Sequence, residues 1–229
     1  MKLRLNILAA SAAFALSGLA HADIVTLAPL TGLTGGALAG TAVYKADLST
    51  LSLGTILSIQ IADNSSGLGG SPGQFSGFDL DAIKLSSTDC ATAACAAGAV
   101  GLAVFDFVGG TTFAPGAQRA PAAPRLFGTT GTGLAVDNSV ASLGDFDGEN
   151  TTVTPFGFLS MGDNGAITFN LTAAVSTGGM FLYIGEVGDN GEVAAGSIRV
   201  NSNRVPEPSS LALAALALLG AGAARRRQA

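Results

Sequence analysis

The chain has 229 residues, with one histidine, no tryptophan and an excess of acidic side chains that gives a net charge of −5. One histidine excludes metal sites built from several imidazoles, and the acidic balance argues against nucleic acid as a partner. A hydrophobic content of 48% excludes a wholly disordered chain.

The first 22 residues have the pattern of a secretory leader. Lys2 and Arg4 form a positively charged start, residues 5–19 an apolar stretch, and Ala20-His21-Ala22 a small-residue cleavage site before Asp23. A retained transmembrane anchor is the alternative, but the small-residue site and the switch to Asp23 fit cleavage better. We therefore expect signal peptidase to cut after Ala22, so that the mature chain begins at Asp23.

Removal of the leader takes away His21, which leaves the body without an imidazole and excludes Ser-His-Asp and Cys-His catalysis. The leader holds two of the 11 Lys and Arg residues and the C-terminal tail holds three. Of the 16 Asp and Glu residues only Glu207 lies in the tail, so the body has 6 basic and 15 acidic side chains, a net charge of −9. This acidic surface is compatible with divalent cations and also keeps a secreted protein soluble.

Residues 23–204 are expected to form a single all-β domain, a jelly-roll-like β-sandwich, because short apolar runs are separated by glycine-rich turns. Two runs alternate as half-buried strands do: Leu57, Ile59 and Ile61, and Ile167, Phe169 and Leu171. No helix of comparable strength appears in the body. The further predicted strands are Phe78–Leu85, Val100–Val108, Thr152–Ser160, Met180–Val187 and Val193–Val200.

Two segments of the body read as irregular. Gly32–Gly40 is small and glycine-rich, which indicates a loop or an irregular edge. Phe113–Pro124 contains three prolines, which remove backbone donors and forbid a central strand, so we expect a long surface loop.

Cys90 and Cys95 are the only cysteines. In an exported chain a disulfide between them is the default, and it closes a small loop worth about 2 kcal/mol. A reactive thiol or a metal-binding pair is the alternative, although no histidine or further cysteine accompanies them.

Acidic clusters are the only constellations that suggest chemistry. Asp145, Asp147 and Glu149 place oxygen donors at every second position next to a glycine, which resembles part of a calcium loop without completing the EF-hand pattern. Asp79 and Asp81 lie on one predicted strand face, either solvent-facing or as a calcium ligand pair. Calcium is therefore a possible cofactor, and Glu186 and Asp189 are candidates to complete its site. Residues 185–192 otherwise read as a hairpin turning at Asp189-Asn190-Gly191.

The last 25 residues, 205–229, form a separate unit. Val205-Pro206-Glu207-Pro208 precedes an uncharged apolar run at 211–224 and the cluster Arg225-Arg226-Arg227. At ~1.5 Å per residue this run makes a helix of roughly 21 Å, which spans a bilayer only with local thinning and snorkelling arginines. By the positive-inside rule the arginines stay cytoplasmic and the body lies outside. A buried helix of a globular core is the alternative.

This arrangement resembles the PEP-CTERM sorting signal of Gram-negative bacteria that make extracellular polysaccharide. The resemblance implies that a membrane-embedded, cysteine-dependent exosortase recognises the motif and cuts near it. It implies an intermediate anchored in the inner membrane, followed by a cell-surface or extracellular location. Stretches 77–83 and 159–186 look, more loosely, like the β-sandwich bodies of other such proteins, which also implies a surface role.

We therefore expect a non-enzymatic surface or biofilm-matrix protein, processed by exosortase and associated with extracellular polysaccharide. The alternative is a calcium-dependent polysaccharide-binding module or a carboxylate-based glycosidase, the one enzyme class that the missing histidine leaves open. No G-x-S-x-G elbow and no Walker motif is present in the sequence.

Overall fold

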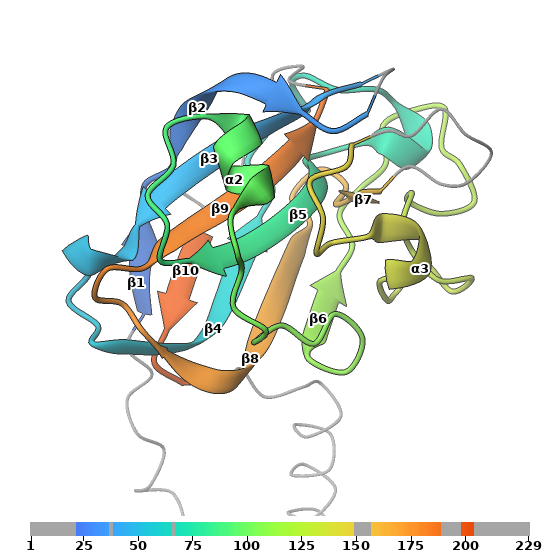
Figure 1. Ribbon diagram of the computed structural model, residues 1–229. Coiled ribbons are helices and arrows are strands. Elements are labelled where there is room, and N and C mark those ends of the chain that lie inside the picture. Colours follow the sequence, from blue (N-terminus) through green and yellow to red (C-terminus); the bar gives the residue numbers. More distant parts are fainter. Residues whose placement is uncertain (1–21, 37–38, 66, 149–156, 189–197, 204–229) are drawn as a thin grey trace, which may run out of the picture.

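The computed structural model describes residues 22–36, 39–65, 67–148, 157–188 and 198–203. In these residues two antiparallel sheets pack face to face (Figure 1). The predicted all-β sandwich is confirmed, and its jelly-roll-like connection stays a prediction. One sheet, called sheet A, has the order β1 (Ala22–Val25), β10 (Ile198–Asn201), β4 (Thr55–Ala62), β8 (Ala166–Ser176) and β6 (Thr111–Ala114). The other, sheet B, has the order β2 (Ala28–Thr34), β3 (Thr41–Asp47), β9 (Phe181–Val187), β5 (Asp79–Ser86) and β7 (Leu159–Ser160).

The core lies between the inner faces of the two sheets. In β8 the predicted alternation holds, since Ile167, Phe169 and Leu171 are all buried in this core. In β4 it holds only from Ile59 onward, because the register with β8 shifts between Ile56 and Ser58. Ile56 therefore joins the core in place of Leu57, which is only half-buried. A bulge of this kind changes the face to which a side chain points, and an alternating pattern does not reveal it.

The other predicted strands have mixed outcomes. β5 and β9 match the predictions over Phe78–Leu85 and Met180–Val187 closely. Of the strand predicted over Val193–Val200, only the last residues are observed, in β10, and of the strand predicted over Thr152–Ser160 only the last two are observed, in β7. Most of the other residues of these two predicted strands lie outside the described residues.

The predicted strand over Val100–Val108 is wrong. Its two ends, Val100 and Val108, are 85% and 79% exposed, and its only ladder contact is an isolated bridge at Phe105. The cause is the Asp106 carboxylate, which accepts hydrogen bonds from the backbone N–H groups of Val108 and Gly109 and so closes a local turn.

The predicted hairpin at 185–192 is also wrong as an arrangement of strands. β9 belongs to sheet B and β10 to sheet A, so the chain crosses from one sheet to the other between them. The turn residues Asp189-Asn190-Gly191 themselves lie outside the described residues.

The two segments expected to be irregular are partly strand. Gly32 lies inside β2, an edge strand whose register with β3 shifts between Pro29 and Leu33, so an irregular edge is an accurate description. Phe113 is buried in β6, which is an edge strand of sheet A, and the proline-containing loop begins after this strand. That loop contains a cis peptide bond between Ala120 and Pro121.

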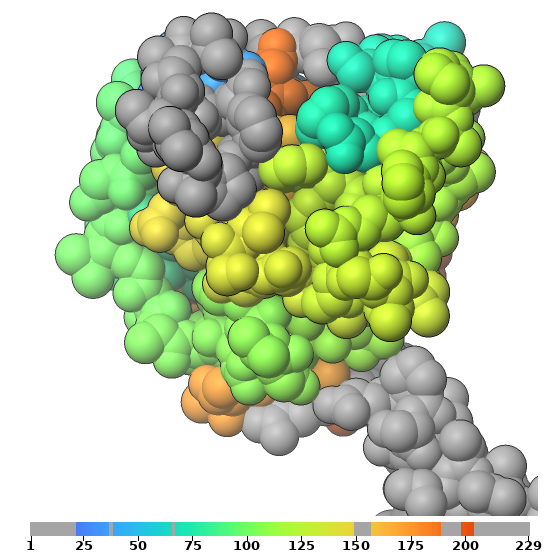
Figure 2. Space-filling view, turned by 90° about the vertical axis from the view of Figure 1, so that its right-hand side faces the viewer, coloured from blue at the N-terminus to red at the C-terminus, as the bar shows by residue number. Residues whose placement is uncertain are grey.

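Short helical turns fill the connections. They are η1 (Leu48–Thr50), η2 (Gly73–Phe75), α2 (Ala93–Gly98) and α3 (Asn138–Ala141). α2 lies over the outer face of sheet B, where Ala93 and Ala96 pack against Val43, Ala82 and Tyr183 (Figure 1). The long connection between β5 and β7, which carries α2, β6 and α3, covers one side of the molecule (Figure 2). None of the helices in the described ranges is long and apolar enough to span a bilayer.

Candidate functional site: the acidic pair and the processing pole

Asp81 and Asp147 are the two predicted calcium ligands that the structure brings together. Asp81 in β5 is completely buried and accepts hydrogen bonds from the Thr41 hydroxyl (2.5 Å) and the Gly148 backbone N–H (3.0 Å). Asp147 shares a side-chain hydrogen bond with Asp81, while its Oδ1 atom is buried and has no hydrogen-bond partner among the described residues. The pair thus links the segment that ends at Gly148 to the outer face of sheet B.

The environment of this pair favours protonated carboxyl groups. The pKa of Asp81 is raised to about 8: burial makes the largest contribution, the hydrogen bond from Thr41 opposes it, and the neighbouring Asp147 adds to it. Burial, followed by the charge of Asp145, raises the pKa of Asp147 to about 6. Two like charges in contact inside a protein are costly, so this environment favours a protonated form of the pair.

The other predicted ligands that lie within the described residues do not join the pair. Asp79 is 5% exposed and accepts a hydrogen bond from the Ser160 hydroxyl (2.5 Å), and Asp145 is exposed. Glu186 is also buried, whereas Glu149 and Asp189 lie outside the described residues. The idea that Asp79 and Asp81 face solvent is wrong. Within the described ranges no three Asp, Glu, His or Cys side chains are placed to hold a metal ion, so the predicted calcium set stays a prediction.

Asp63, which the sequence reasoning missed, organises the same end of the sandwich. This aspartate follows β4 directly and is 5% exposed. Its carboxylate accepts hydrogen bonds from the backbone N–H groups of Phe78 and Asn164 (both 2.9 Å) and from the Ser65 hydroxyl (2.5 Å). The signal for it was the Asp63-Asn64-Ser65 run immediately after a strand, a composition typical of side-chain-capped turns.

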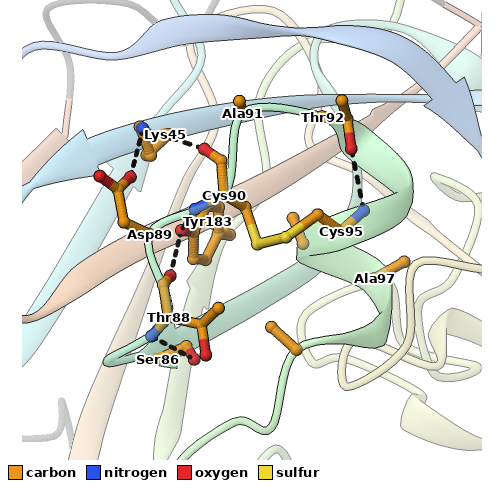
Figure 3. The surroundings of a disulfide bond; sticks show 12 residues. Lys45, Ser86, Thr88, Asp89, Cys90, Ala91, Thr92, Cys95, Ala97 and Tyr183 are labelled. Atoms are coloured by element: carbon orange, nitrogen blue, oxygen red, sulfur yellow. Dashed lines mark hydrogen bonds and ion pairs between the residues drawn. A yellow bond between two sulfur atoms is a disulfide. The ribbon is translucent and has the colours of Figure 1, made fainter.

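The predicted disulfide between Cys90 and Cys95 is formed in the structure (Figure 3). It joins the loop after β5 to α2, at a place where the Cys90 N–H donates to the Tyr183 hydroxyl (2.9 Å) and that hydroxyl donates to the Thr88 carbonyl (2.6 Å). Lys45 donates to the Cys90 carbonyl and pairs with Asp89. The bridge therefore fastens α2 over the outer face of sheet B, which is a structural role.

A cleft of about 320 Å³ lies between β5 and the connection that follows it. Lys84, Phe105, Phe107 and Asp145 are among its lining residues. The Lys84 ammonium donates to the carbonyls of Ala96, Ala97 and Ala99 at the end of α2, at 2.8–3.1 Å. Burial lowers the pKa of this lysine, and Asp145 opposes that effect. Lys84 is thus engaged in capping α2, and no other Lys or Arg is among the described residues that line the cleft.

The two ends of the body lie side by side. β1 and β10 are antiparallel neighbours, with Ala22 opposite Asn201 and Asp23 opposite Val200. The Asp23 carboxylate accepts hydrogen bonds from the N–H (2.9 Å) and hydroxyl (2.8 Å) of Ser52. The predicted leader cleavage position, Ala22–Asp23, therefore sits at the same end of sheet A as the exit of β10, while Ala20 lies outside the described residues.

The chain remains attached to the body until just before the predicted sorting motif. The Ser58 hydroxyl donates to the Asn203 carbonyl (2.9 Å), and the Asn201 amide donates to the Ser58 hydroxyl (3.2 Å). Thr177 bonds to the carbonyls of Leu53 and Gly54, so the loops that precede β4 and β9 belong to this end as well. We call it the processing pole, which comprises residues 22–23, 51–54, 177–180 and 201–203.

The residues that continue from this pole, Val205, Pro206, Glu207, Pro208 and the three arginines, lie outside the described residues, as does the predicted helix at 211–224. Comparison with protein families finds a match there: the model of the PEP-CTERM protein-sorting motif matches residues 204–227. Neither the comparison with curated proteins nor that with solved structures gives a match.

Proposed function

From the PEP-CTERM protein-sorting motif that this chain carries, we propose that it is an exported structural protein of the bacterial cell surface or extracellular matrix. The motif marks the chain as an exported substrate of exosortase that is anchored through its C-terminus before processing. The association with extracellular polysaccharide or biofilm is the finer part of the proposal. It rests on the sorting motif, which resembles the signal used by bacteria that make extracellular polysaccharide.

Several features of the body favour a structural role over catalysis. The sequence after the leader has no histidine, so no imidazole base is available. The Asp81–Asp147 carboxyls are hydrogen-bonded to each other, whereas glycosidases hold their two carboxyls at least ~5 Å apart around the sugar. Asp81 is also completely buried, so no substrate reaches it in this conformation.

The proposal predicts that the mature protein lacks the apolar tail segment. Intact mass of the protein from its native host should correspond to a chain cut near the motif, without residues 211–224. A Glu207→Ala variant should keep the tail and remain in the membrane fraction, because the motif is altered. Gln228→Ala, a change beyond the arginine cluster, should be processed as wild type. A mature wild-type protein that retains 211–224 would show that exosortase does not process this chain.

Calcium binding is the second candidate, and it rests on the buried Asp147 Oδ1 atom beside Asp81. Calcium prefers carboxylate oxygens, and its binding would displace the proton that the pair shares. Millimolar calcium at pH 8 should therefore raise the melting temperature by several degrees over that in chelator, and by less at pH 5. Asp147→Asn should abolish the increase, whereas Asp89→Asn, on the exposed side of the molecule, should preserve it. Equal melting temperatures with calcium and with chelator would exclude the site.

A further inference from the structure

The processing pole lies very close to the sorting motif. Among the described residues, the last one fastened to the body is Asn203, whose carbonyl accepts a hydrogen bond from Ser58. Only three residues separate it from Glu207 at the centre of the motif. A fully extended chain covers at most ~3.6 Å per residue, so the four steps from Asn203 to Glu207 span at most about 14 Å. A domain of roughly 180 residues has a radius of gyration of ~16 Å, so this linker is shorter than the body is wide. An enzyme that acts on the motif must therefore work next to the pole.

Hydrogen bonds hold the linker in a defined direction. β10 is an interior strand of sheet A, flanked by β1 and β4, and Asn201 pairs with both Ala22 and Ser58. Detaching the segment up to Asn203 would break these pairings and remove the buried Val200 from the core. The folded body therefore holds the chain up to Asn203 at the end of sheet A that carries loops 51–54 and 177–180.

The chemistry of the pole suits a protein partner better than a lipid surface. Its described residues include no Lys or Arg, and its one charged side chain is Asp23, which does not attract anionic headgroups. Its exposed positions are small or polar, including Ser52, Gly54 and Gly178. Its large apolar side chains, Leu51, Leu53 and Met180, are buried or half-buried, and its exposed apolar residue is the small Ala22.

We propose that the processing pole is a docking surface for the membrane-embedded enzyme that cuts the sorting tail. This inference rests on the proposed function, because it requires that exosortase acts on this chain. Recognition then has two parts, the motif itself and the adjoining face of the folded body. The pairing of β10 with its neighbours sets the spacing between them.

Three glycines allow a direct test of the contact. An added Cβ at Gly54 or at Gly98 would meet no atom within 4 Å, and one at Gly178 would meet only the Ser176 hydroxyl at 3.8 Å. A photo-crosslinking residue can therefore replace each glycine without a clash. Gly54 and Gly178 lie on the processing pole, whereas Gly98, at the end of α2 on the outer face of sheet B, is the matched control.

The crosslinking is done with the full chain in its native host, which carries an inactive, epitope-tagged exosortase so that the complex persists. The positions of Gly54 and Gly178 should give tagged adducts at least tenfold above that of Gly98. Equal yields at the three positions, or adducts with lipid alone, would overturn the docking surface.

A spacer tests the geometry independently. Ten Gly and Ser residues inserted after Asn203 should reduce the Gly54 adduct and slow tail removal more than threefold, because the motif no longer lies beside the pole. The same spacer inserted after Gly131, in an exposed turn, should change neither. Tail removal and crosslinking that do not respond to the first spacer would overturn the inference. If the tail is removed normally but these results fail, the docking surface is wrong and the proposed function stands. If wild type keeps its tail, the proposed function itself fails.

Discussion

Raising the pH from 4 to 9 in the presence of chelator should lower the free energy of unfolding by several kcal/mol. Because its pKa is raised to about 8, Asp81 keeps its proton in the folded state up to about pH 8, whereas the unfolded chain releases it near the ordinary aspartate pKa of 3.8. Between these pH values the folded state binds more protons than the unfolded state, so stability falls as the pH rises. At ~1.36 kcal/mol per pKa unit, this shift corresponds to a loss on the order of 5 kcal/mol for the buried group. Urea denaturation at a series of pH values measures it.

Asp81→Asn is the matched control for this pH dependence. The amide can accept from the Gly148 N–H and donate to Asp147, as the protonated carboxyl does, but it does not titrate. The variant should therefore show a much flatter stability profile between pH 4 and 8, and it should exceed wild type in stability at pH 9. A wild-type stability that stays level or increases over this range would show that the pair is ionised in the folded protein.

Replacing Asp63 with alanine should cost about 3–5 kcal/mol of stability. The change leaves the N–H groups of Phe78 and Asn164 and the Ser65 hydroxyl without their acceptor at a buried position. Each unsatisfied buried donor costs ~1–3 kcal/mol, and the three segments joined by Asp63 would separate together. Chemical denaturation of purified protein at constant pH measures the loss.

Asp137→Ala provides the comparison for Asp63. Asp137 caps the start of α3 by accepting from the Ser139 N–H (3.2 Å) and hydroxyl (2.5 Å), both exposed interactions. Loss of an exposed helix cap costs ~1 kcal/mol. Equal losses in the two variants would indicate that Asp63 acts as a local turn cap rather than as a hub of three segments.

The sequence predicts the fold class because apolar and polar side chains alternate along a long strand that has one buried face. Ile167, Phe169 and Leu171 show this in β8. It fails where a local interaction competes with the ladder, as at Asp106, whose carboxylate closes a turn inside an apolar run. It also fails for short edge strands such as β1 and β6, each of four residues, which are too short to show a period.

Prediction from sequence is limited in a similar way for the acidic side chains of the candidate site. Composition indicates that Asp79 and Asp81 lie on a strand, and the structure places both in β5. The burial of Asp81 depends on the segment that carries Phe146, Asp147 and Gly148, more than 60 residues further on. Asp79 is bonded instead by Ser160 of β7. Spacing along the chain contains no information about that contact, so neither the pair nor its shared proton could be predicted. The tail, by contrast, was predicted from residues 205–227 alone because enzymes read such motifs in an extended local segment.

The antiparallel pairing of β1 with β10 determines which part of the body points away from the envelope. Any attachment made through either terminus leaves from one end of sheet A. The opposite end, with Asp63 after β4 and the Asp81–Asp147 pair beside the start of β3, is then displayed outward.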